Sequence, residues 1–494
     1  MKPGISKNVI WNLAGTLAHL LAGFVVMPFL IRHLGQTGYG LWTLVASMTS
    51  YFGVLDLGTS GSVARNLAYY RSQNDNNGVN AILNSALAIL WVAAGIAIVA
   101  TVGVLMVFFS LFEVPQDQMA AVQWAVLLVG ANLALSFPLS VSGGILWAYE
   151  RFDLQNIIDI PVVALRTALT LYLIGQGHGL IALAIITFST SLLQGLSKWS
   201  LAFWIEPRLR LGFGWVQRDA VRILFDYGVW FFLLSLARTI TPQIPLTLIG
   251  HWLSVAKVAV FRIPTQLVAY ADGFLISATQ VLTPIATSLH ANRKATEQQR
   301  LFLEGGKFSL LLAFYVLVSF CWLGEPFIRR WIGAEYSSTW RLLMILALGE
   351  FLPMSQWVSY SIILGMGKHK PLAWISLLEN LTVVTLLLLL GPADLPAVCV
   401  AIAVPAMLCR GVYRLLYTCR LVQVSPWTYL RHTFAPTLGV AIPGSAIVAL
   451  ITSLYAPGSW LGLIAVGAAY SAVFWGVAAI GVFGWKRCKE VITW

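Results

Sequence analysis

The sequence predicts an all-α polytopic membrane protein, and three observations support this fold class. The 494-residue chain is 59% hydrophobic and only 10% charged, with a mean hydropathy of +0.80, which is far more apolar than a water-exposed domain. Apolar segments of roughly 20 residues, the length that crosses a hydrocarbon core of ~30 Å, recur along the whole chain. Positive residues gather in alternate connections between these segments.

By this length criterion we count about fourteen transmembrane spans, with boundaries uncertain by several residues. Their approximate cores are 8–31, 40–63, 82–111, 119–147, 155–175, 179–203, 222–250, 254–288, 307–328, 339–365, 371–390, 395–420, 432–455 and 459–484. The 254–288 segment is too long for one straight crossing. Its Pro264, Gly273 and Pro284 predict a helix that is kinked or partly outside the membrane.

The distribution of Lys and Arg predicts that both termini are cytoplasmic. The connections on the predicted inner side carry Arg65 and Arg71, then Arg151, and later Lys368 and Lys370, whereas 114–118, 175–179, 391–396 and 455–459 contain no Lys or Arg. Arg32, Arg329 and Arg330 break the alternation. Because the 8–31 segment lacks a convincing cleavage site, we interpret it as a retained first helix rather than a removed signal peptide.

The net charge of +12 does not indicate a nucleic-acid partner, because the basic residues lie in small groups between apolar spans instead of in one patch. The connections are too short to hold a catalytic domain, and the sequence contains no Walker A, HExxH or GxSxG pattern and no metal-ligand spacing. We therefore expect a protein that is not an enzyme and that has no cofactor and no metal site.

Residues 28–65 suggest a membrane protein with a polar interior rather than a simple anchor. A corner rich in glycine, with Gly35, Gly38 and Gly40 close to Arg32, joins the first two spans. The second span then carries an acid, Asp56, within apolar sequence. An ionisable residue inside the membrane is energetically costly, which makes it a candidate functional residue. Its distance of nine residues from Arg65 places it nearer the cytoplasmic end and favours a gate contact or a helix break.

A weak internal similarity relates 28–42 to 245–261, since both run from a proline through a short Gly/His corner into the next span. It favours a division into six spans, six spans and two. We therefore predict a first lobe at 1–210, a second lobe at 211–425, and two appended helices with a cytoplasmic tail at 426–494.

Residues at the start of the chain also resemble those of a known family. The pattern comprises Asn12, Gly15, Gly23, Pro28, Arg32, Leu34, Gly35, Tyr39, Gly40, Leu41, Trp42, Tyr51, Phe52, Leu55, Asp56, Leu57, Gly58 and Arg65. It is similar to the opening of the Wzx-type polysaccharide and O-antigen flippases, a branch of the multidrug/oligosaccharidyl-lipid/polysaccharide (MOP) exporter superfamily. The segments 327–336 and 365–371 resemble two later corners of that family.

The resemblance implies two pseudo-symmetric six-helix lobes around a central cavity, with helices thirteen and fourteen appended. It implies an inner-membrane flippase that moves an undecaprenyl-pyrophosphate-linked oligosaccharide or repeat unit from the cytoplasmic to the periplasmic leaflet by alternating access. The expected partners are this lipid-linked oligosaccharide, the membrane lipids, and a polysaccharide polymerase or other assembly proteins. Composition and spacing do not themselves indicate such a substrate.

A pyrophosphate that crosses a membrane needs fixed cations, and Arg suits phosphate because its guanidinium binds bidentately. Arg166, Arg238 and Arg262 lie well inside the fifth, seventh and eighth predicted spans, and Lys198 is nearer the end of the sixth. The alternative for each is snorkelling to the interface or a structural ion pair. Asn12 and His19 on the first span are candidate hydrogen-bonding groups for sugar, although helix packing explains such residues equally well.

Acidic residues in the spans are candidates for coupling or gating, because a carboxylate there can neutralise an arginine, bind H⁺ or help to hold Na⁺. The candidates are Asp272, Glu350 and Glu379, together with Asp56 and Asp159. Asp159 lies seven residues before Arg166 and is a possible partner for it. Glu350 and Glu379 are near the middles of adjacent spans and are expected to form an acidic pair.

Two other functions stay open at this point. The first is an ion-coupled exporter of drugs or organic cations from the same superfamily, whose cavity would contain few deep arginines. The second is a membrane enzyme of glycan assembly, which the short connections disfavour. A scaffold without transport activity would not need the intramembrane charges.

Overall fold

The computed structural model describes residues 5–56, 59–279, 282–368, 370–390, 394–454 and 458–483. Within these ranges the side chains of 5–10, 12, 13, 60, 61, 225–235, 237, 238, 240, 241, 454, 480 and 483 are not described. The described chain is helical throughout and divides into two compact units, unit 1 at Met1–Ala259 and unit 2 at Val260–Trp494.

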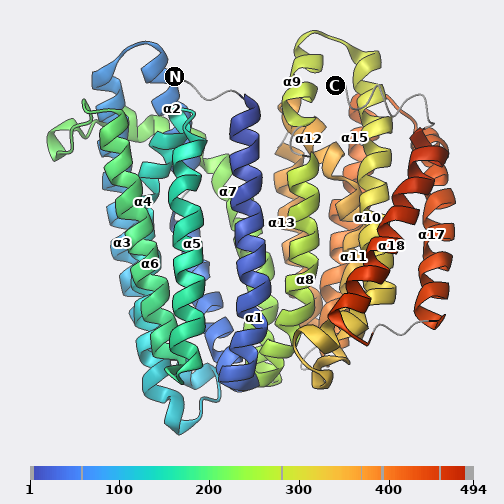
Figure 1. Cartoon of the computed structure of the whole chain (residues 1–494). Helices are drawn as coiled ribbons and strands as arrows, with labels where there is room; N and C mark the ends of the chain where they lie inside the picture. The colour runs from blue at the N-terminus through green and yellow to red at the C-terminus, as the bar shows by residue number, and fades with distance from the viewer. Residues whose placement is uncertain are drawn as a thin grey trace. The chain divides into compact units, whose positions relative to one another are not determined.

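Unit 1 is a bundle of long helices (Figure 1). It contains α1 (Ile5–Ser50), the 3₁₀ segment η1 (Tyr51–Asp56), α2 (Thr59–Ser72), α3 (Asn76–Leu111), η2 (Gln116–Gln118), α4 (Met119–Ala148), α5 (Phe152–Gly175), α6 (Gly179–Ile205), η3 (Phe213–Trp215), α7 (Arg218–Trp252) and the first residues of α8 (Val255–Thr279).

Unit 2 holds the rest of α8 and a second set of helices, several of which are interrupted. They are α9 (Leu282–Ala291), α10 (Ala295–Trp331), η4 (Ala334–Tyr336), α11 (Thr339–Ser355), α12 (Trp357–Gly365), α13 (Lys370–Leu390), α14 (Leu395–Ala406), the π-helical η5 (Met407–Tyr413), α15 (Arg414–Val422), α16 (Pro426–Tyr429), the π-helical η6 (Leu430–Phe434), α17 (Ala435–Leu454), α18 (Trp460–Ala478) and the π-helical η7 (Ala479–Phe483).

The first predicted span and the first part of the second fall in α1, which is broken at Gly35, and the second continues into η1 and α2. A straight helix of 46 residues would be about 70 Å long, more than twice the hydrocarbon thickness. Gly35 adopts a φ of 70°, a left-handed conformation that glycine reaches without steric cost. The predicted glycine corner is therefore the point where one span ends and the next begins.

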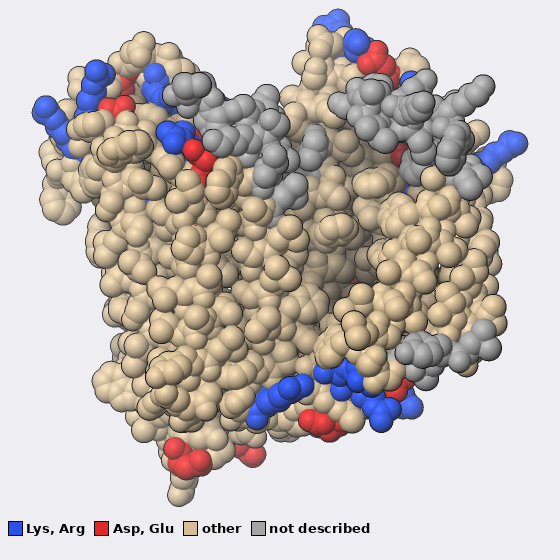
Figure 2. All heavy atoms as spheres, in the orientation of Figure 1, with Lys and Arg blue, Asp and Glu red and all other residues tan. Residues whose placement is uncertain are grey.

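Eleven segments of the described chain are long and apolar enough to cross a membrane. Within the predicted 254–288 span the structure describes α8 and α9, and residues 280–281 between them lie outside the described residues. The predicted 339–365 span is two helices, since α11 ends at Ser355, just after Pro353, and α12 begins at Trp357. In each unit the charged side chains visible in Figure 2 lie towards the two ends, and the surface between them is almost free of charge.

Unit 1 has its core between α2, α3 and α4, and α7 packs on α1, α2 and α3. The helix that follows the predicted first lobe therefore packs with it in this structure.

The extended segment that leaves α6 is held by the side-chain amides of two asparagines of α3. Asn80 bonds to the Arg208 carbonyl and the Arg210 amide, and Asn84 to the Arg210 carbonyl and the Gly212 amide. The connection from α6 to α7 is thus fixed along its length.

Unit 2 packs α17 and α18 against α10. The rings of Tyr315 and Tyr470 are stacked, with centroids 5.1 Å apart, and the Tyr315 hydroxyl lies 2.6 Å from Ser471 Oγ. Around them is a buried cluster of aromatic and aliphatic side chains that includes Phe474. The two predicted appended helices therefore have a substantial apolar interface within unit 2.

Candidate functional site

Two groups of charged side chains lie within the predicted membrane-spanning helices, one in each unit. The first surrounds a groove of about 350 Å³ that is lined by α4, α5 and α6, which we call the α4–α6 groove. Its polar lining residues are Asn132, Ser136, Ser140, Gln155, Ser191, Gln194 and Lys198. So many polar groups inside apolar helices are typical of a path for a polar ligand.

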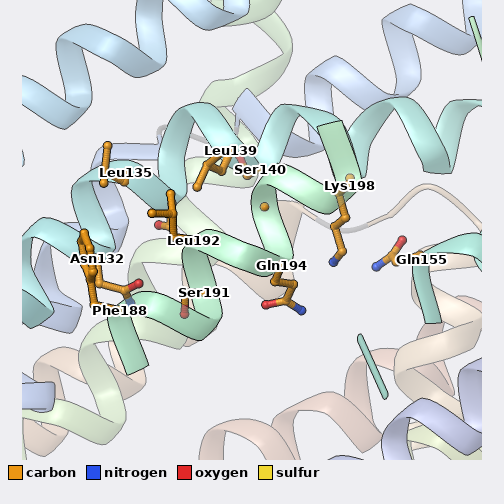
Figure 3. Close-up of a pocket in the computed structure, with 13 residues that line it drawn as sticks. Asn132, Leu135, Leu139, Ser140, Gln155, Phe188, Ser191, Leu192, Gln194 and Lys198 are labelled. Atoms are coloured by element: carbon orange, nitrogen blue, oxygen red, sulfur yellow. The ribbon is translucent and has the colours of Figure 1, made fainter. Parts of the chain in front are cut away.

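Lys198 is the charged residue of the α4–α6 groove. It lies seven residues before the end of α6, about 10 Å along the helix, and its Nζ is 2.7 Å from Asp159 Oδ1 on α5. Gln194 donates a second hydrogen bond of 2.6 Å to the same oxygen. Figure 3 shows Lys198 and Gln155 with their polar ends directed toward each other from α6 and α5.

The geometry of α6 in this region depends on Gly195. A Cβ at this position would lie 2.7 Å from Leu139 Cδ1 of α4, so only glycine permits the close approach of α6 to α4. The approach places Gln194 and Lys198, the residues that flank this contact, beside the groove. A larger residue at 195 would separate the walls that bring the polar side chains together.

Arg166 binds α6 in the same region of unit 1. Its Nε donates to Thr190 Oγ1 at 2.8 Å and its Nη2 to Ser191 Oγ at 2.9 Å. Both partners are neutral hydroxyl groups, so they orient the guanidinium without cancelling its charge. Ser191 is itself a lining residue of the α4–α6 groove, which places Arg166 next to it.

The predicted pairing of Asp159 with Arg166 is wrong. Seven residues separate the two along α5, about 10 Å on the helix axis, and facing residues of α6 are closer to each. Asp159 therefore pairs with Lys198, and Arg166 with Thr190 and Ser191.

The second group lies in unit 2 and is centred on Arg410, in the π-helical segment η5. Arg410 donates from Nη2 and Nη1 to the two carboxylate oxygens of Glu350, at 2.5 and 3.0 Å, and from Nε to Glu379 Oε1 at 2.8 Å. The predicted acidic pair of Glu350 and Glu379 thus exists as two carboxylates on one arginine. Within η5, Gly411 lies against Leu352 of α11, where a Cβ would be only 2.6 Å from Leu352 Cβ.

Arg414 and Asp272 complete this group, which we call the Arg410 cluster: Asp272, Glu350, Glu379, Arg410 and Arg414. Arg414 is 6% exposed and lies over the rings of Tyr360 and Trp357, at 5.2 and 5.6 Å from their centroids. Asp272 accepts a 2.7 Å hydrogen bond from Trp357 Nε1. Asp272 thereby fixes the indole ring that lies under Arg414.

The other predicted residues lie away from these two groups or outside the described residues. The side chains of Arg238 and Asn12 are outside them. His19 is exposed on α1, and Arg262 is half-buried on α8. Asp56 is the last residue of the 3₁₀ segment η1, and the two residues that follow it, 57 and 58, lie outside the described residues.

Sequence reasoning missed Arg410, Arg414 and the groove residues Gln155, Ser191 and Gln194. A signal for the arginines existed: they stand four residues apart inside the predicted 395–420 span, a spacing that places both on one face of a helix. The uncharged groove residues carried no comparable signal, because isolated Ser and Gln in a span are common in helix packing.

At the predicted cytoplasmic end of unit 1, outside the spans, Tyr149 donates a 2.7 Å hydrogen bond to Glu206 Oε2 and lies under Arg71, whose Cζ is 3.9 Å from the ring centroid. Burial and the Glu206 carboxylate raise the pKa of Tyr149 above its ordinary value. This hydrogen bond joins the C-terminal ends of α4 and α6.

Comparison with known proteins identifies the family. Residues 5–290, more than half of the chain, match the model of the family described as "Polysaccharide biosynthesis protein". The chain belongs to this family. Among its relatives are a protein of Shigella flexneri named "Putative O-antigen transporter", 21% identical with 78% of this chain and 90% of the relative covered, and the membrane protein EpsK of Bacillus subtilis, 22% identical with 94% and 92% covered.

Solved structures share the fold. The lipid II flippase MurJ in an inward closed conformation matches with a TM-score of 0.70 at 13% identity, covering 94% of this chain and 99% of MurJ. An inward-facing multidrug resistance MATE transporter of the MOP superfamily matches with a TM-score of 0.63 at 14% identity, covering 86% and 96%. The predicted all-α fold and the predicted family are confirmed, and this family member is a multi-pass membrane protein.

Proposed function

We propose that the protein is a flippase that moves an undecaprenyl-pyrophosphate-linked oligosaccharide or repeat unit from the cytoplasmic to the periplasmic leaflet of a bacterial inner membrane, with both termini in the cytoplasm. In this proposal it acts by alternating access and serves surface polysaccharide biosynthesis, as a transporter and not as an enzyme. A polysaccharide polymerase would consume the translocated product.

The observation that carries this proposal is the α4–α6 groove. A lipid-linked oligosaccharide has an anionic pyrophosphate and a sugar rich in hydroxyl groups. Lys198 and the neighbouring Arg166 supply cations for phosphate oxygens, while Gln155, Ser191 and Gln194 supply donors and acceptors for hydroxyl groups. Membership of the polysaccharide biosynthesis family supports the same class of cargo.

Export of organic cations is the rival function, and the Arg410 cluster argues against it. A cation carrier needs a carboxylate that its ligand can neutralise, but the carboxylates of Glu350 and Glu379 both bind the guanidinium of Arg410. A membrane enzyme of glycan assembly is disfavoured too, because the connections between the apolar spans are too short to hold a catalytic domain.

The driving force in this proposal is the membrane potential or a gradient of H⁺ or Na⁺. A potential contributes ~2.3 kcal/mol per charge per 100 mV, enough to bias the movement of an anionic cargo. Asp272, Glu350 and Glu379 are the proposed coupling residues. We expect Asp272→Asn or Glu379→Gln to change the dependence of transport on pH or Na⁺; an unchanged dependence would remove this role.

The test of the cargo assignment uses cells whose surface polysaccharide depends on this protein. Lys198→Gln and Arg166→Gln are expected to reduce surface glycan and to make the lipid-linked precursor accumulate in the inner membrane. Lys257→Gln, at an exposed lysine outside the groove, is the matched control and is expected to behave as the natural protein does. Normal surface glycan in both groove variants, at equal protein levels, would refute the assignment.

The predicted roles of Arg238 and Arg262 are tested in the same cells. Arg238→Ala and Arg262→Ala are expected to retain the precursor on the cytoplasmic side, because each removes a cation proposed to face the pyrophosphate. Purified protein in liposomes with a fluorescent lipid-linked oligosaccharide and an impermeant quencher measures the direction of movement. If the quencher removed the same fraction of fluorescence in liposomes with and without the protein, translocation by the protein would be contradicted.

A further inference from the structure

Arg410 and Arg414 form a pair whose hydrogen-bonding capacity is only partly used. They stand four residues apart, about 6 Å along the helix, where η5 passes into α15. A guanidinium has five N–H donors, and Arg410 directs three of them at Glu350 and Glu379. Its side chain is 25% exposed, and two of its donors are not used by these carboxylates.

Arg414 carries the stronger signal. It is 94% buried, yet its Nε has no hydrogen-bond partner in the described part of the chain. Tyr360 and Trp357 lie under its guanidinium and stabilise the positive charge through their rings, but a ring face does not replace an in-plane acceptor. A buried cation with an unused N–H donor indicates that an acceptor joins it in another state of the protein.

The contact of Glu350 with Arg410 shows which ligand chemistry fits. Both carboxylate oxygens of Glu350 face the two terminal nitrogens of the guanidinium, at 2.5 and 3.0 Å. Two oxygens of a phosphate group bind a guanidinium in the same fork geometry. Glu350 therefore occupies the position at which a phosphate would bind Arg410, and Arg414 lies one helical turn away to receive a second phosphate.

We propose that Arg410 and Arg414 form a binding site for a diphosphate group, and that Glu350 and Glu379 occupy this site when no diphosphate is bound. The inference rests on the proposed function in that the diphosphate of a lipid-linked sugar is its intended ligand. Entry of the ligand releases the two carboxylates from Arg410. The site thus exchanges one set of anions for another instead of opening an uncompensated cation in the membrane.

A purely structural ion network and a site that competes for a ligand predict opposite effects of Glu350→Gln on anion binding. If Glu350 and Glu379 only stabilise Arg410 in the fold, replacing Glu350 by Gln disturbs the site and any weak anion binding falls. If they compete with a ligand, Glu350→Gln removes a competitor and anion binding becomes tighter. A gain of affinity does not result from misfolding, so this variant separates the two cases.

The experiment measures dissociation constants by calorimetry on the full-length protein in nanodiscs of uncharged lipid. The probes are farnesyl diphosphate and inorganic pyrophosphate. We expect Arg414→Gln to weaken binding about tenfold or more, as for the loss of a charged hydrogen bond, and Glu350→Gln to tighten it about threefold or more. Arg341→Gln and Glu335→Gln, at exposed residues of unit 2, are the matched controls and are expected to leave binding unchanged.

If farnesyl diphosphate binds and inorganic pyrophosphate does not, the result supports a lipid-linked ligand. If both probes bind equally, the result supports a site for any diphosphate. Unchanged binding in Arg414→Gln, or unchanged or weaker binding in Glu350→Gln, would overturn the proposal. The result is independent of the cell assay on Lys198 and Arg166: a failed flippase assignment leaves these binding measurements interpretable, and failed binding here leaves the α4–α6 groove as the proposed cargo site.

Discussion

The α4–α6 groove and the Arg410 cluster place cations inside helices by two different means. In the groove, Lys198 has one carboxylate partner and Arg166 has two hydroxyl partners. In the Arg410 cluster, one arginine is held by two carboxylates and its neighbour is stacked on aromatic rings. The first arrangement leaves the positive charge of Arg166 uncompensated beside the groove. The second sets three carboxylates, those of Asp272, Glu350 and Glu379, against two guanidinium groups and so compensates all of the positive charge within the protein.

The comparison suggests a division of tasks. Uncompensated charge next to a polar groove attracts an anionic ligand from a distance, because charge in a low-dielectric surrounding is weakly screened. Compensated charge attracts little until its internal partners are displaced. The groove is thus suited to capture a ligand, and the Arg410 cluster to respond to one.

The largest expected difference between the two regions is in stability. Arg410→Met leaves Glu350 and Glu379 facing each other without their common cation, which is expected to lower the free energy of unfolding by about 3 to 5 kcal/mol. Lys198→Met is expected to cost about 1 kcal/mol, because Gln194 still donates to Asp159. Denaturant unfolding of both variants in the same lipid measures this difference. Equal decreases in the free energy of unfolding for Arg410→Met and Lys198→Met would show that the two regions do not differ in how they compensate charge.

A smaller effect is expected when the carboxylate of the groove is neutralised. Asp159→Asn removes the ion pair with Lys198 but keeps a hydrogen-bonding side chain, so the expected destabilisation is about 1 kcal/mol. The positive charge of the groove rises at the same time, and we expect surface glycan to persist. Loss of surface glycan as complete as that in Lys198→Gln would mean that Asp159, and not the cation, is the functional partner.

The smallest effect is expected from Arg166→Lys. The charge is kept, but an ammonium group does not reproduce the planar fork that binds Thr190 and Ser191 together, so the expected loss of stability is about 0.5 to 1 kcal/mol. Precursor accumulation in this variant is expected to lie between the natural protein and Arg166→Gln. An effect equal to that of Arg166→Gln would show that fork geometry matters more than charge.

The fold was largely accessible from sequence because each crossing needs a long apolar run that composition alone reveals. The breaks in these runs were harder to place. Gly35 signalled its own break, since a left-handed φ favours glycine, and Pro353 lies just before the end of α11. The π-helical turn around Arg410 had no comparable signal in the sequence, and the close packing of its Gly411 on Leu352 is a tertiary contact.

The candidate site was only partly predictable, for a physical reason. Sequence shows which helices carry charged residues, and so Glu350 and Glu379 were recognised as a pair. It does not show the rotation and axial offset of neighbouring helices, which decide that Asp159 meets Lys198 rather than Arg166. Sequence reasoning missed Arg410 and Arg414 although their four-residue spacing was a signal, and their partners on α11, α12 and α13 are fixed only by packing.

The two asparagines of α3 that hold the segment after α6 have a practical consequence for protein engineering. An extended segment whose amide and carbonyl groups are bound one by one exchanges its amide hydrogens slowly and tolerates no insertion. An epitope tag placed between Arg210 and Gly212 would have to break the contacts to Asn84, whereas the exposed turn at Gln176–His178 makes none of this kind. Surface labels and fusion partners for unit 1 therefore belong at that turn.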